Sequence, residues 1–314
     1  MTTAFTFPGQ GSQSVGMGRA LAESYAAARR VFEEVDEALG ESLSTVIFEG
    51  PEDALTLTAN AQPALMATSI AALRALEETG VDVKAMASFV AGHSLGEYSA
   101  LVAAGSLSVT DAARLLRARG LAMQSAVAAG EGAMAALLGV DLEVAAAVAA
   151  EAAEDEVCDV ANDNAPGQVV LSGSKAAVER AVALAKTRGA KRAVLLAVSA
   201  PFHCSLMAPA AEVMAEALAS ATVRAPVVPL YANVTASPVS DPAEIRRLLV
   251  EQVTGTVRWR ESVAALAAGG VDCFVEIGAG TVLTGLAKRI ARDARAFAVG
   301  TPADVEAFGE RLAG

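Results

Sequence analysis

Cysteine and histidine are both scarce in this chain of 314 residues. The three cysteines, Cys158, Cys204 and Cys273, are an odd number, lie far apart and include no C-x-x-C pair. With only two histidines beside them, they argue against a disulfide scaffold and against a zinc module. We therefore expect a reduced protein that uses neither a metal nor a cofactor.

Long apolar runs are missing too. No segment approaches about 18 consecutive apolar residues, and the N-terminus has neither the basic start nor the apolar stretch of a signal peptide. These absences predict a soluble protein of the cytoplasm with no membrane partner.

Basic residues are in the minority: 24 Lys and Arg stand against 36 Asp and Glu, a formal net charge of −12. Such a surface is not built to neutralise phosphates, so we expect no nucleic acid as a partner.

Hydrophobic residues, in contrast, make up 54% of the chain, which is enough for a sizeable core. At about 150 residues per domain, the length allows one large domain or two modest ones.

Short apolar strands alternate with helical patterns along most of the chain. The first strand, residues 4–7, ends at the turn Pro8-Gly9-Gln10-Gly11. Further strands are predicted at 87–91, 227–232 and 273–277, and helices at 20–39, 62–78, 97–105, 241–252 and 281–291. This alternation predicts an α/β fold with a parallel sheet covered on both faces.

Residues 127–197 follow a different order. Strands are predicted at 133–140, 157–161, 168–172 and 192–198, helices at 142–153 and 175–188, and a turn-rich loop at 162–167. The order βαββαβ is that of a ferredoxin-like unit. We interpret 127–197 as a small inserted subdomain, and 1–126 together with 198–314 as the large domain.

The segment Gly92-His93-Ser94-Leu95-Gly96 lies between an apolar strand and a helical pattern, the context that a G-x-S-x-G nucleophile elbow requires. Side chains at positions 92 and 96 would collide with the adjoining backbone. The helix that follows leaves N–H groups free, so the amide of Leu95 can face a developing oxyanion. The alternative is a structural turn in a chain with 26 glycines, but the strand-turn-helix setting favours Ser94 as a nucleophile.

A serine hydroxyl needs a base, and the chain offers only His93 and His203 as imidazoles. His93 precedes Ser94 on the elbow, so its side chain should point away and pack at the turn. His203 lies in a loop that leaves the inserted subdomain, and we favour it as the base over a loop histidine held by hydrogen bonds. No acid follows the order of an α/β-hydrolase triad, which predicts a Ser-His dyad oriented by a backbone carbonyl or an amide.

Seven motifs occur in order along the chain. They are Pro8-Gly9-Gln10-Gly11-Ser12-Gln13, Gly92-His93-Ser94-Leu95-Gly96-Glu97, Arg119-Gly120 followed by Met123-Gln124, Asn164-Ala165-Pro166-Gly167-Gln168-Val169, Phe202-His203, Asn233-Val234-Thr235 and Glu276-Ile277-Gly278. Together they resemble the malonyl-CoA:acyl-carrier-protein transacylase family over essentially the whole chain. The resemblance implies an α/β-hydrolase-like large domain with a ferredoxin-like insertion. It also implies transfer of a malonyl group from malonyl-CoA to acyl carrier protein, for which we expect a monomer.

The resemblance further implies roles in a two-step reaction through a malonyl-serine. Ser94 carries the acyl group and His203 is its base. Gln10 lines the oxyanion hole with Leu95. Gln252 orients the histidine through its backbone carbonyl, which takes the place of the acid of a catalytic triad.

Three more positions are expected to contact substrate. Arg119 closes a predicted helix, where a cation is ordinary, and Arg114 and Arg117 share that stretch. A malonyl carboxylate nevertheless favours one buried, bidentate arginine, and the resemblance selects Arg119. Phe202 either narrows the space around the acyl α-carbon or belongs to the core. Asn164 is assigned to the substrate-binding group from its motif.

Two clusters of basic residues are normally explained as solvated faces. They are Lys186, Arg188, Lys191 and Arg192, and Lys288, Arg289, Arg292 and Arg295. In so acidic a chain, they are also candidate patches for an acidic carrier protein or for the phosphates of CoA.

Two other functions remain open on the sequence. A serine esterase or thioesterase would use the same nucleophile and differ only in accepting water at the second step. The carboxylate-binding arginine, the position of the histidine and the missing acid favour the transferase. A non-catalytic scaffold that binds a carrier protein is the alternative from another class, and the intact Ser94 and His203 argue against it.

Overall fold

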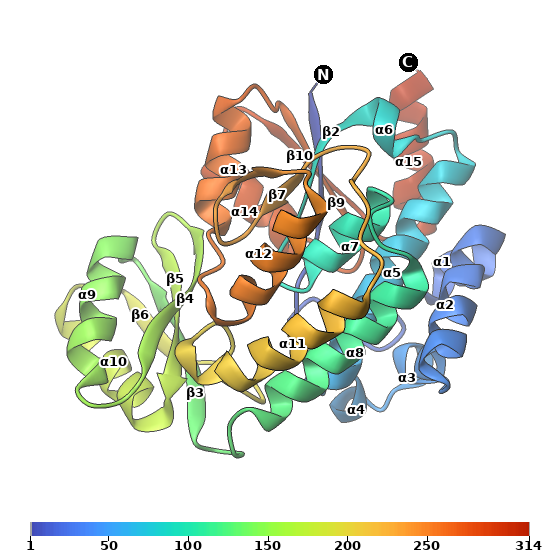
Figure 1. The fold of residues 1–314 in the computed structure, drawn as a ribbon. Coiled ribbons are helices and arrows are strands. Elements are labelled where there is room, and N and C mark those ends of the chain that lie inside the picture. The colour runs from blue at the N-terminus through green and yellow to red at the C-terminus, as the bar shows by residue number, and fades with distance from the viewer. Residues whose placement is uncertain (1, 314) are drawn as a thin grey trace.

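A computed structural model describes residues 2–313, which form two lobes with a β-sheet in each (Figure 1). Within these residues, the larger sheet has six strands in the order β10 (Arg295–Val299), β9 (Cys273–Ile277), β1 (Thr3–Phe7), β2 (Ala87–Gly92), β7 (Leu230–Ala232) and β8 (Ser237–Val239). The first five strands run parallel, and β8 is antiparallel to β7. The prediction of an α/β fold with a parallel sheet is confirmed.

Helices cover the two faces of this sheet because side chains alternate along each buried strand. On β1, Ala4 packs with Trp259 and Leu286 on one face, whereas Phe5 and Phe7 join the larger core on the other. The first face carries α13 (Trp259–Ala268) and α14 (Val282–Ile290). The opposite core includes α5 (Thr58–Glu78), α7 (Gly96–Ala103) and α8 (Val109–Ser125), which Figure 1 shows side by side. The other helices of the larger lobe are α1 (Arg19–Ser24), α2 (Ala26–Leu39), α3 (Leu43–Glu49), α4 (Glu52–Thr56), α6 (Val83–Met86), the 3-10 turn Ser205–Met207, α11 (Ala208–Ser220), α12 (Pro242–Thr254) and α15 (Pro302–Ala313).

The smaller sheet is antiparallel and has a core of its own. Its elements are β3 (Gly132–Leu138), α9 (Leu142–Ala153), β4 (Cys158–Ala165), β5 (Gln168–Ser174), α10 (Lys175–Thr187) and β6 (Arg192–Leu195). The strand order in space is β4-β5-β3-β6. Figure 1 shows α9 and α10 on one face of this sheet, at the side of the molecule away from α2.

Several predicted boundaries are wrong: the strands predicted at 192–198 and 227–232 are shorter, and the helix predicted at 62–78 begins earlier, at Thr58. The helix predicted at 20–39 breaks at Tyr25, whose backbone is extended, and α2 starts anew with the N–H of Ala27 donating to Glu78 Oε1 at 2.8 Å. The loop predicted at 162–167 is mostly strand, because β4 continues to Ala165 and only Pro166-Gly167 turns.

Arg119 does not lie at the end of its helix, where the sequence predicts it. Helix α8 continues to Ser125, so Arg119 lies well inside it. Gly120 does not stop the helix. A Cβ there would lie 2.6 Å from Ala59 Cα, so this glycine lets α8 approach the start of α5 closely.

None of the helices within residues 2–313 is long and apolar enough to cross a membrane. The same part of the chain brings together no group of His, Cys, Asp and Glu that could hold a metal ion.

Candidate active site

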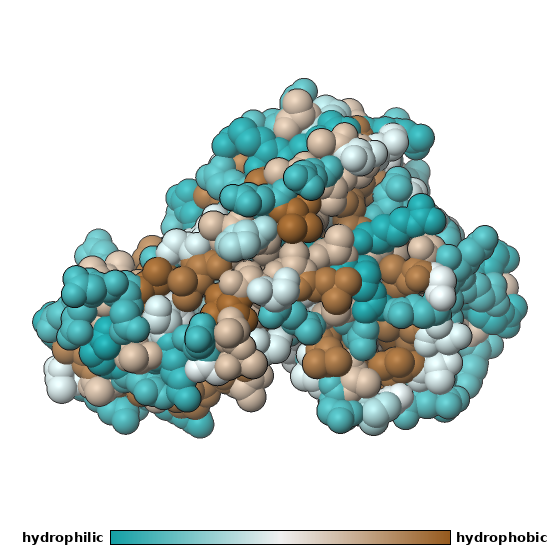
Figure 2. Space-filling model, turned by 60° about the horizontal axis from the view of Figure 1, so that its bottom comes forward, coloured by the Kyte–Doolittle hydropathy of each residue, from teal (hydrophilic) through white to brown (hydrophobic). Residues whose placement is uncertain are grey.

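A cavity of about 820 Å³ lies where the two lobes meet. Its lining includes Gln10, Ser94, Leu95 and Arg119 from the larger lobe, Met134 and Asn162 from the smaller sheet, and Leu196, Phe202 and His203 from the segment that follows β6. Leu57 and Leu196 also line it and are 47% and 37% exposed, so the cavity has an apolar rim. Figure 2 shows apolar side chains gathered between the lobes on the face that lies at the bottom of Figure 1.

Ser94 sits on a sharp turn between β2 and α7, with φ at 53° in the left-handed region. A Cβ at Gly92 would lie 1.9 Å from the backbone of Gly96, and one at Gly96 would lie 2.3 Å from Phe7 O. The predicted need for glycine at both positions is therefore confirmed. The N–H of Ser94 donates to Asn233 Oδ1 at 2.8 Å, which fixes the turn from behind.

Two backbone amides remain available beside the serine. The N–H groups of Leu95 and Gln10 donate to no carbonyl or side chain among the residues described, and both residues line the cavity. The Gln10 side chain is turned to Thr58, with Nε2 donating to Oγ1 at 3.2 Å. The two amides are thus free to bind an oxyanion.

His203 approaches Ser94 from the loop after β6. Its Nε2 lies 2.7 Å from Ser94 Oγ, and its Nδ1 lies 2.8 Å from the backbone oxygen of Gln252. A carbonyl oxygen can only accept, so Nδ1 carries the proton and Nε2 accepts from the serine hydroxyl. The backbone of His203 is itself strained, with φ at 57°.

The imidazole of His203 is kept neutral. Burial lowers its pKa to about 3, and the positive charge of Arg119 acts in the same direction. The hydrogen bond to Gln252 opposes this shift without cancelling it. His203 is therefore an unprotonated base throughout the neutral range.

Arg119 is 1% exposed and reaches the cavity beside the serine. Its Nη2 donates to Ser94 Oγ at 3.1 Å and to Gln252 Oε1 at 2.7 Å, while Nη1 donates to Gln62 Oε1 at 2.8 Å. The guanidinium also lies over the ring of Tyr98, 5.9 Å from its centroid. Burial lowers the pKa of Arg119, and its hydrogen-bond partners are all neutral.

Two residues of the motifs to which the sequence assigns no role, Glu97 and Asn233, support the site. Glu97 accepts from the backbone N–H of Asn233 at 2.5 Å and from the side chain of Gln252. Burial raises the pKa of Glu97 to about 8. Asn233 also donates through its side chain to Gly92 O at 2.7 Å. The sequence offered one signal for Glu97: it is an acidic residue in the first turn of the helix that follows the elbow, where the chain is expected to be buried.

Asn164, expected to contact substrate, is not among the residues that line the cavity, although its partner His93 is. Its Oδ1 lies 2.8 Å from His93 Nε2, so it accepts a hydrogen bond from that imidazole. His93 packs against Trp259, with ring centroids 5.6 Å apart, and burial lowers its pKa. Phe202, in contrast, is 8% exposed and belongs to the cavity wall.

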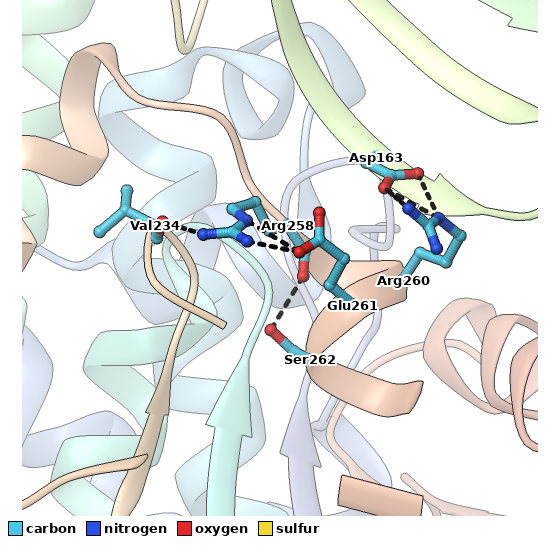
Figure 3. Close-up of polar contacts among 6 residues, drawn as sticks. All are labelled: Asp163, Val234, Arg258, Arg260, Glu261 and Ser262. Atoms are coloured by element: carbon cyan, nitrogen blue, oxygen red, sulfur yellow. Dashed lines mark hydrogen bonds and ion pairs between the residues drawn. The ribbon is translucent and has the colours of Figure 1, made fainter. Parts of the chain in front are cut away.

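Figure 3 shows the polar contacts at the start of α13, where Arg258 meets Val234 and Arg260 meets Asp163. Arg258 Nη1 donates to Val234 O at 3.2 Å, next to Asn233. Arg260 donates through Nε to both oxygens of Asp163, at 3.0 and 2.9 Å, and Asp163 is 1% exposed. Asp163 lies on β4 between Asn162, which lines the cavity, and Asn164, which accepts the hydrogen bond from His93. The contacts of α13 therefore join the smaller sheet to the larger lobe beside the cavity.

Taken together, the cavity holds a serine with a neutral base, two free amides and a buried cation. This combination suits transfer of an acyl group that carries a negative charge. In the residues described, no carboxylate contacts His203, so the base is oriented by a backbone carbonyl instead.

Comparison with known proteins agrees with this chemistry. A family model described as "Acyl transferase domain" matches residues 4–304. A malonyl CoA-acyl carrier protein transacylase from Bacillus subtilis is 50% identical, over 96% of this chain and 95% of the relative. The protein of that name from Escherichia coli K12 is 47% identical, over 97% of each chain.

Solved structures show the same similarity. An acyl-carrier-protein-S-malonyltransferase from Bartonella henselae superposes with a TM-score of 0.97 at 58% identity, covering 100% of both chains. A malonyl-transacylase solved in complex with its type II PKS acyl-carrier protein has a TM-score of 0.96 at 42% identity, covering 99% of this chain and 100% of the other.

Proposed function

The chain belongs to the acyl transferase domain family, and from this premise we propose that it transfers malonyl from malonyl-CoA to the phosphopantetheine thiol of acyl carrier protein. One observation carries the proposal. The hydroxyl of Ser94 lies between a neutral base and a buried cation, 2.7 Å from His203 Nε2 and 3.1 Å from Arg119 Nη2. A nucleophile so close to a cation suits an acyl group with its own carboxylate.

In the first step, His203 Nε2 takes the proton of Ser94 while Oγ attacks the thioester carbonyl. The amides of Leu95 and Gln10 bind the negative charge that develops on the carbonyl oxygen. The C–S bond then breaks, and His203 returns the proton to the departing sulfur of CoA. In the second step the carrier thiol gives its proton to His203 and attacks the malonyl ester; the ester C–O bond to Ser94 then breaks, and His203 returns the proton to Ser94 Oγ.

Arg119 supplies the recognition of malonyl. A guanidinium can hold a carboxylate through two parallel hydrogen bonds, and such pairs are strong where water is excluded. Phe202 narrows the cavity near the acyl α-carbon, which disfavours a methyl branch by about 1–3 kcal/mol. Gln252 orients His203 through its backbone and Arg119 through its side chain.

The finer architecture belongs to the same proposal. The larger lobe is α/β-hydrolase-like, and residues 127–197 are a ferredoxin-like insertion whose strand order is β4-β5-β3-β6. The enzyme acts as a monomer in the cytoplasm and uses no cofactor besides its substrates. The basic clusters at 186–192 and 288–295 are its candidate contacts to the acidic carrier.

Mass spectrometry of the intact protein after incubation with malonyl-CoA tests the proposal. A malonyl adduct is expected on Ser94, to be lost on addition of holo-carrier protein, with parallel lines in double-reciprocal plots. Ser94→Ala is the matched control and should carry no adduct. Release of free malonate without transfer to the carrier would favour a thioesterase, and no adduct with intersecting lines would contradict the mechanism.

A further inference from the structure

Glu97 is a buried carboxylate for which the mechanism above has no use. It is 1% exposed and lies in the first turn of α7, three residues after Ser94. Its Oε1 accepts from the N–H of Asn233, and its Oε2 accepts from Nε2 of Gln252. Both oxygens thus face donors, an environment that suits an ionised carboxylate.

Arg119 is equally buried, and the two charges do not touch. Within residues 2–313 no direct ion pair joins them, because the side-chain amide of Gln252 lies between. Gln252 Oε1 accepts from Arg119 Nη2 at 2.7 Å, and its Nε2 donates to Glu97. A buried cation needs a counter-charge. Glu97 provides one from behind and leaves the cavity side of the guanidinium free of any carboxylate.

We propose that Glu97, when ionised, is the counter-charge of Arg119 in the empty site, and that the carboxylate of malonyl binds Arg119 only in the form in which Glu97 carries a proton, which in alkaline solution is taken up from solvent. The proposal rests on the function proposed above. Without proton uptake, two carboxylates would share one guanidinium in a buried site, and like charges so placed cannot both stay ionised easily. With uptake, the proton binds a carboxylate oxygen of Glu97 and the net charge of the site is unchanged. No bond of the substrate is altered.

The other elements around Glu97 offer little competition as proton acceptors. Helix α12 and the loop after β7 face it with the neutral amides of Gln252 and Asn233. Strands β1 and β2 contain no titratable residue, and the charged residues of α5 lie in its last two turns. From β7, Tyr231 has a pKa that burial raises above its ordinary value.

The titratable groups nearest to Glu97 also stay in one state near neutral pH. Burial raises the pKa of Tyr98 to about 12, and Arg119 remains a cation. His203, with a pKa of about 3, and His93, whose pKa burial lowers, are both neutral above pH 7. Glu97, with a pKa of about 8, is left as the group of the site that titrates between pH 7 and 9.

The first test is the pH dependence of acyl selectivity. We expect the ratio of kcat/KM for malonyl-CoA over acetyl-CoA to fall by up to about tenfold per pH unit above the pKa of Glu97, because ionised Glu97 opposes a second carboxylate. Acetyl has no carboxylate and serves as the internal reference. Glu97→Gln should flatten this profile whatever it does to the absolute rate.

Glu276→Gln is the matched control. Glu276 is also 1% exposed and accepts from the N–H groups of Leu283 and Thr284, away from the cavity. This variant should keep the slope of the wild type. A selectivity ratio that does not change with pH in the wild type, or a slope that survives in Glu97→Gln, would overturn the proposal.

A second measurement does not depend on the folding of Glu97→Gln. Malonyl-CoA is titrated calorimetrically into Ser94→Ala protein at pH 8.5, in buffers of different ionisation enthalpy. Uptake of most of one proton is expected for malonyl-CoA and none for acetyl-CoA, and equal uptake for both would refute the idea. Adduct formation on wild-type Ser94 is recorded in parallel. Missing adduct contradicts the transferase assignment, whereas adduct with a flat ratio contradicts only the role of Glu97.

Discussion

His203 is a base whose charge state is set by its surroundings before any substrate arrives. Replacing it with alanine should lower the rate of Ser94 malonylation at least about 100-fold, the scale of a lost general base. Because the pKa of His203 is about 3, the wild-type rate should stay level as the pH falls from 7 to 5. Rapid-quench measurement of the adduct tests both statements.

His93→Ala is the control for that experiment. His93 contacts Asn164 and Trp259 rather than the serine hydroxyl, so its loss should act on the turn and on stability. A folded His93→Ala protein without activity, beside an active His203→Ala protein, would reverse the two assignments.

We expect Arg119 to decide which acyl group is used. In Arg119→Ala, the malonyl carboxylate would be buried without its partner, which typically costs about 2–5 kcal/mol. We expect kcat/KM for malonyl-CoA to fall roughly 30-fold to several thousand-fold, while acetyl-CoA keeps its rate or gains. Competition between the two thioesters measures the ratio.

Arg117→Ala provides the comparison on the same helix. The Arg117 side chain turns away from the serine and pairs with Asn60 and Glu41. Its removal should leave the malonyl to acetyl ratio unchanged. An Arg119→Ala protein with an unchanged ratio would show that Arg119 does not recognise the carboxylate.

The sequence was sufficient to propose Ser94, His203 and Arg119, which the structure brings into contact. It did not reveal Glu97, because the chemistry of that residue lies in partners 136 and 155 positions away, in Asn233 and Gln252. Residue type and local pattern indicate that an acid beside an elbow is buried. They do not indicate which donors meet it after the chain has folded.

Among the elements, the contact between β4 and α13 makes an asymmetric prediction. Arg260→Ala leaves Asp163 buried without a counter-ion and should lower the free energy of unfolding by about 3 kcal/mol. Asp163→Asn should cost less, because the Arg260 side chain is 32% exposed and can be hydrated. Urea denaturation of both variants gives the two values. Equal losses in the two variants would contradict the prediction that a buried, unpaired Asp163 costs more than an unpaired Arg260.

Two of the well-predicted helices have a side chain that caps their start, although α10 and α14 were predicted as well without one. Asp141 and Asp241 accept from the backbone N–H groups of Val144 and Glu244, and the helices they begin were predicted within a few residues. Helices α11 and α13 were not predicted. Their N-cap residues, Met207 and Arg258, make no side-chain cap, and the only start signals are Pro209 in the first turn of α11 and Glu261 in the first turn of α13. Their position is decided by packing against the rest of the molecule.

For the molecule as a whole, Glu97 links stability to pH. Its folded pKa of about 8 lies above the ordinary 4.5, so the folded state holds a proton that the unfolded state releases in this range. Stability from this group is therefore lost as the pH rises from 4.5 to 8, by up to about 1.4 kcal/mol per pH unit. The unfolding free energy of the wild type minus that of Glu97→Gln should therefore fall as the pH rises. Denaturation at pH 6, 7 and 8 checks this, and a constant difference would contradict it.

The central place of β1 in the larger sheet has a consequence for synthesis of the chain. Thr6 Oγ1 donates to Val275 O, 269 positions later. At about 5–20 residues per second, translation leaves β1 without its β9 neighbour for on the order of tens of seconds. Asn233, which fixes the turn of Ser94, and Gln252, which anchors His203, are made only toward the end of that time. A ribosome-bound nascent chain therefore gains the ability to consume malonyl-CoA only late in translation.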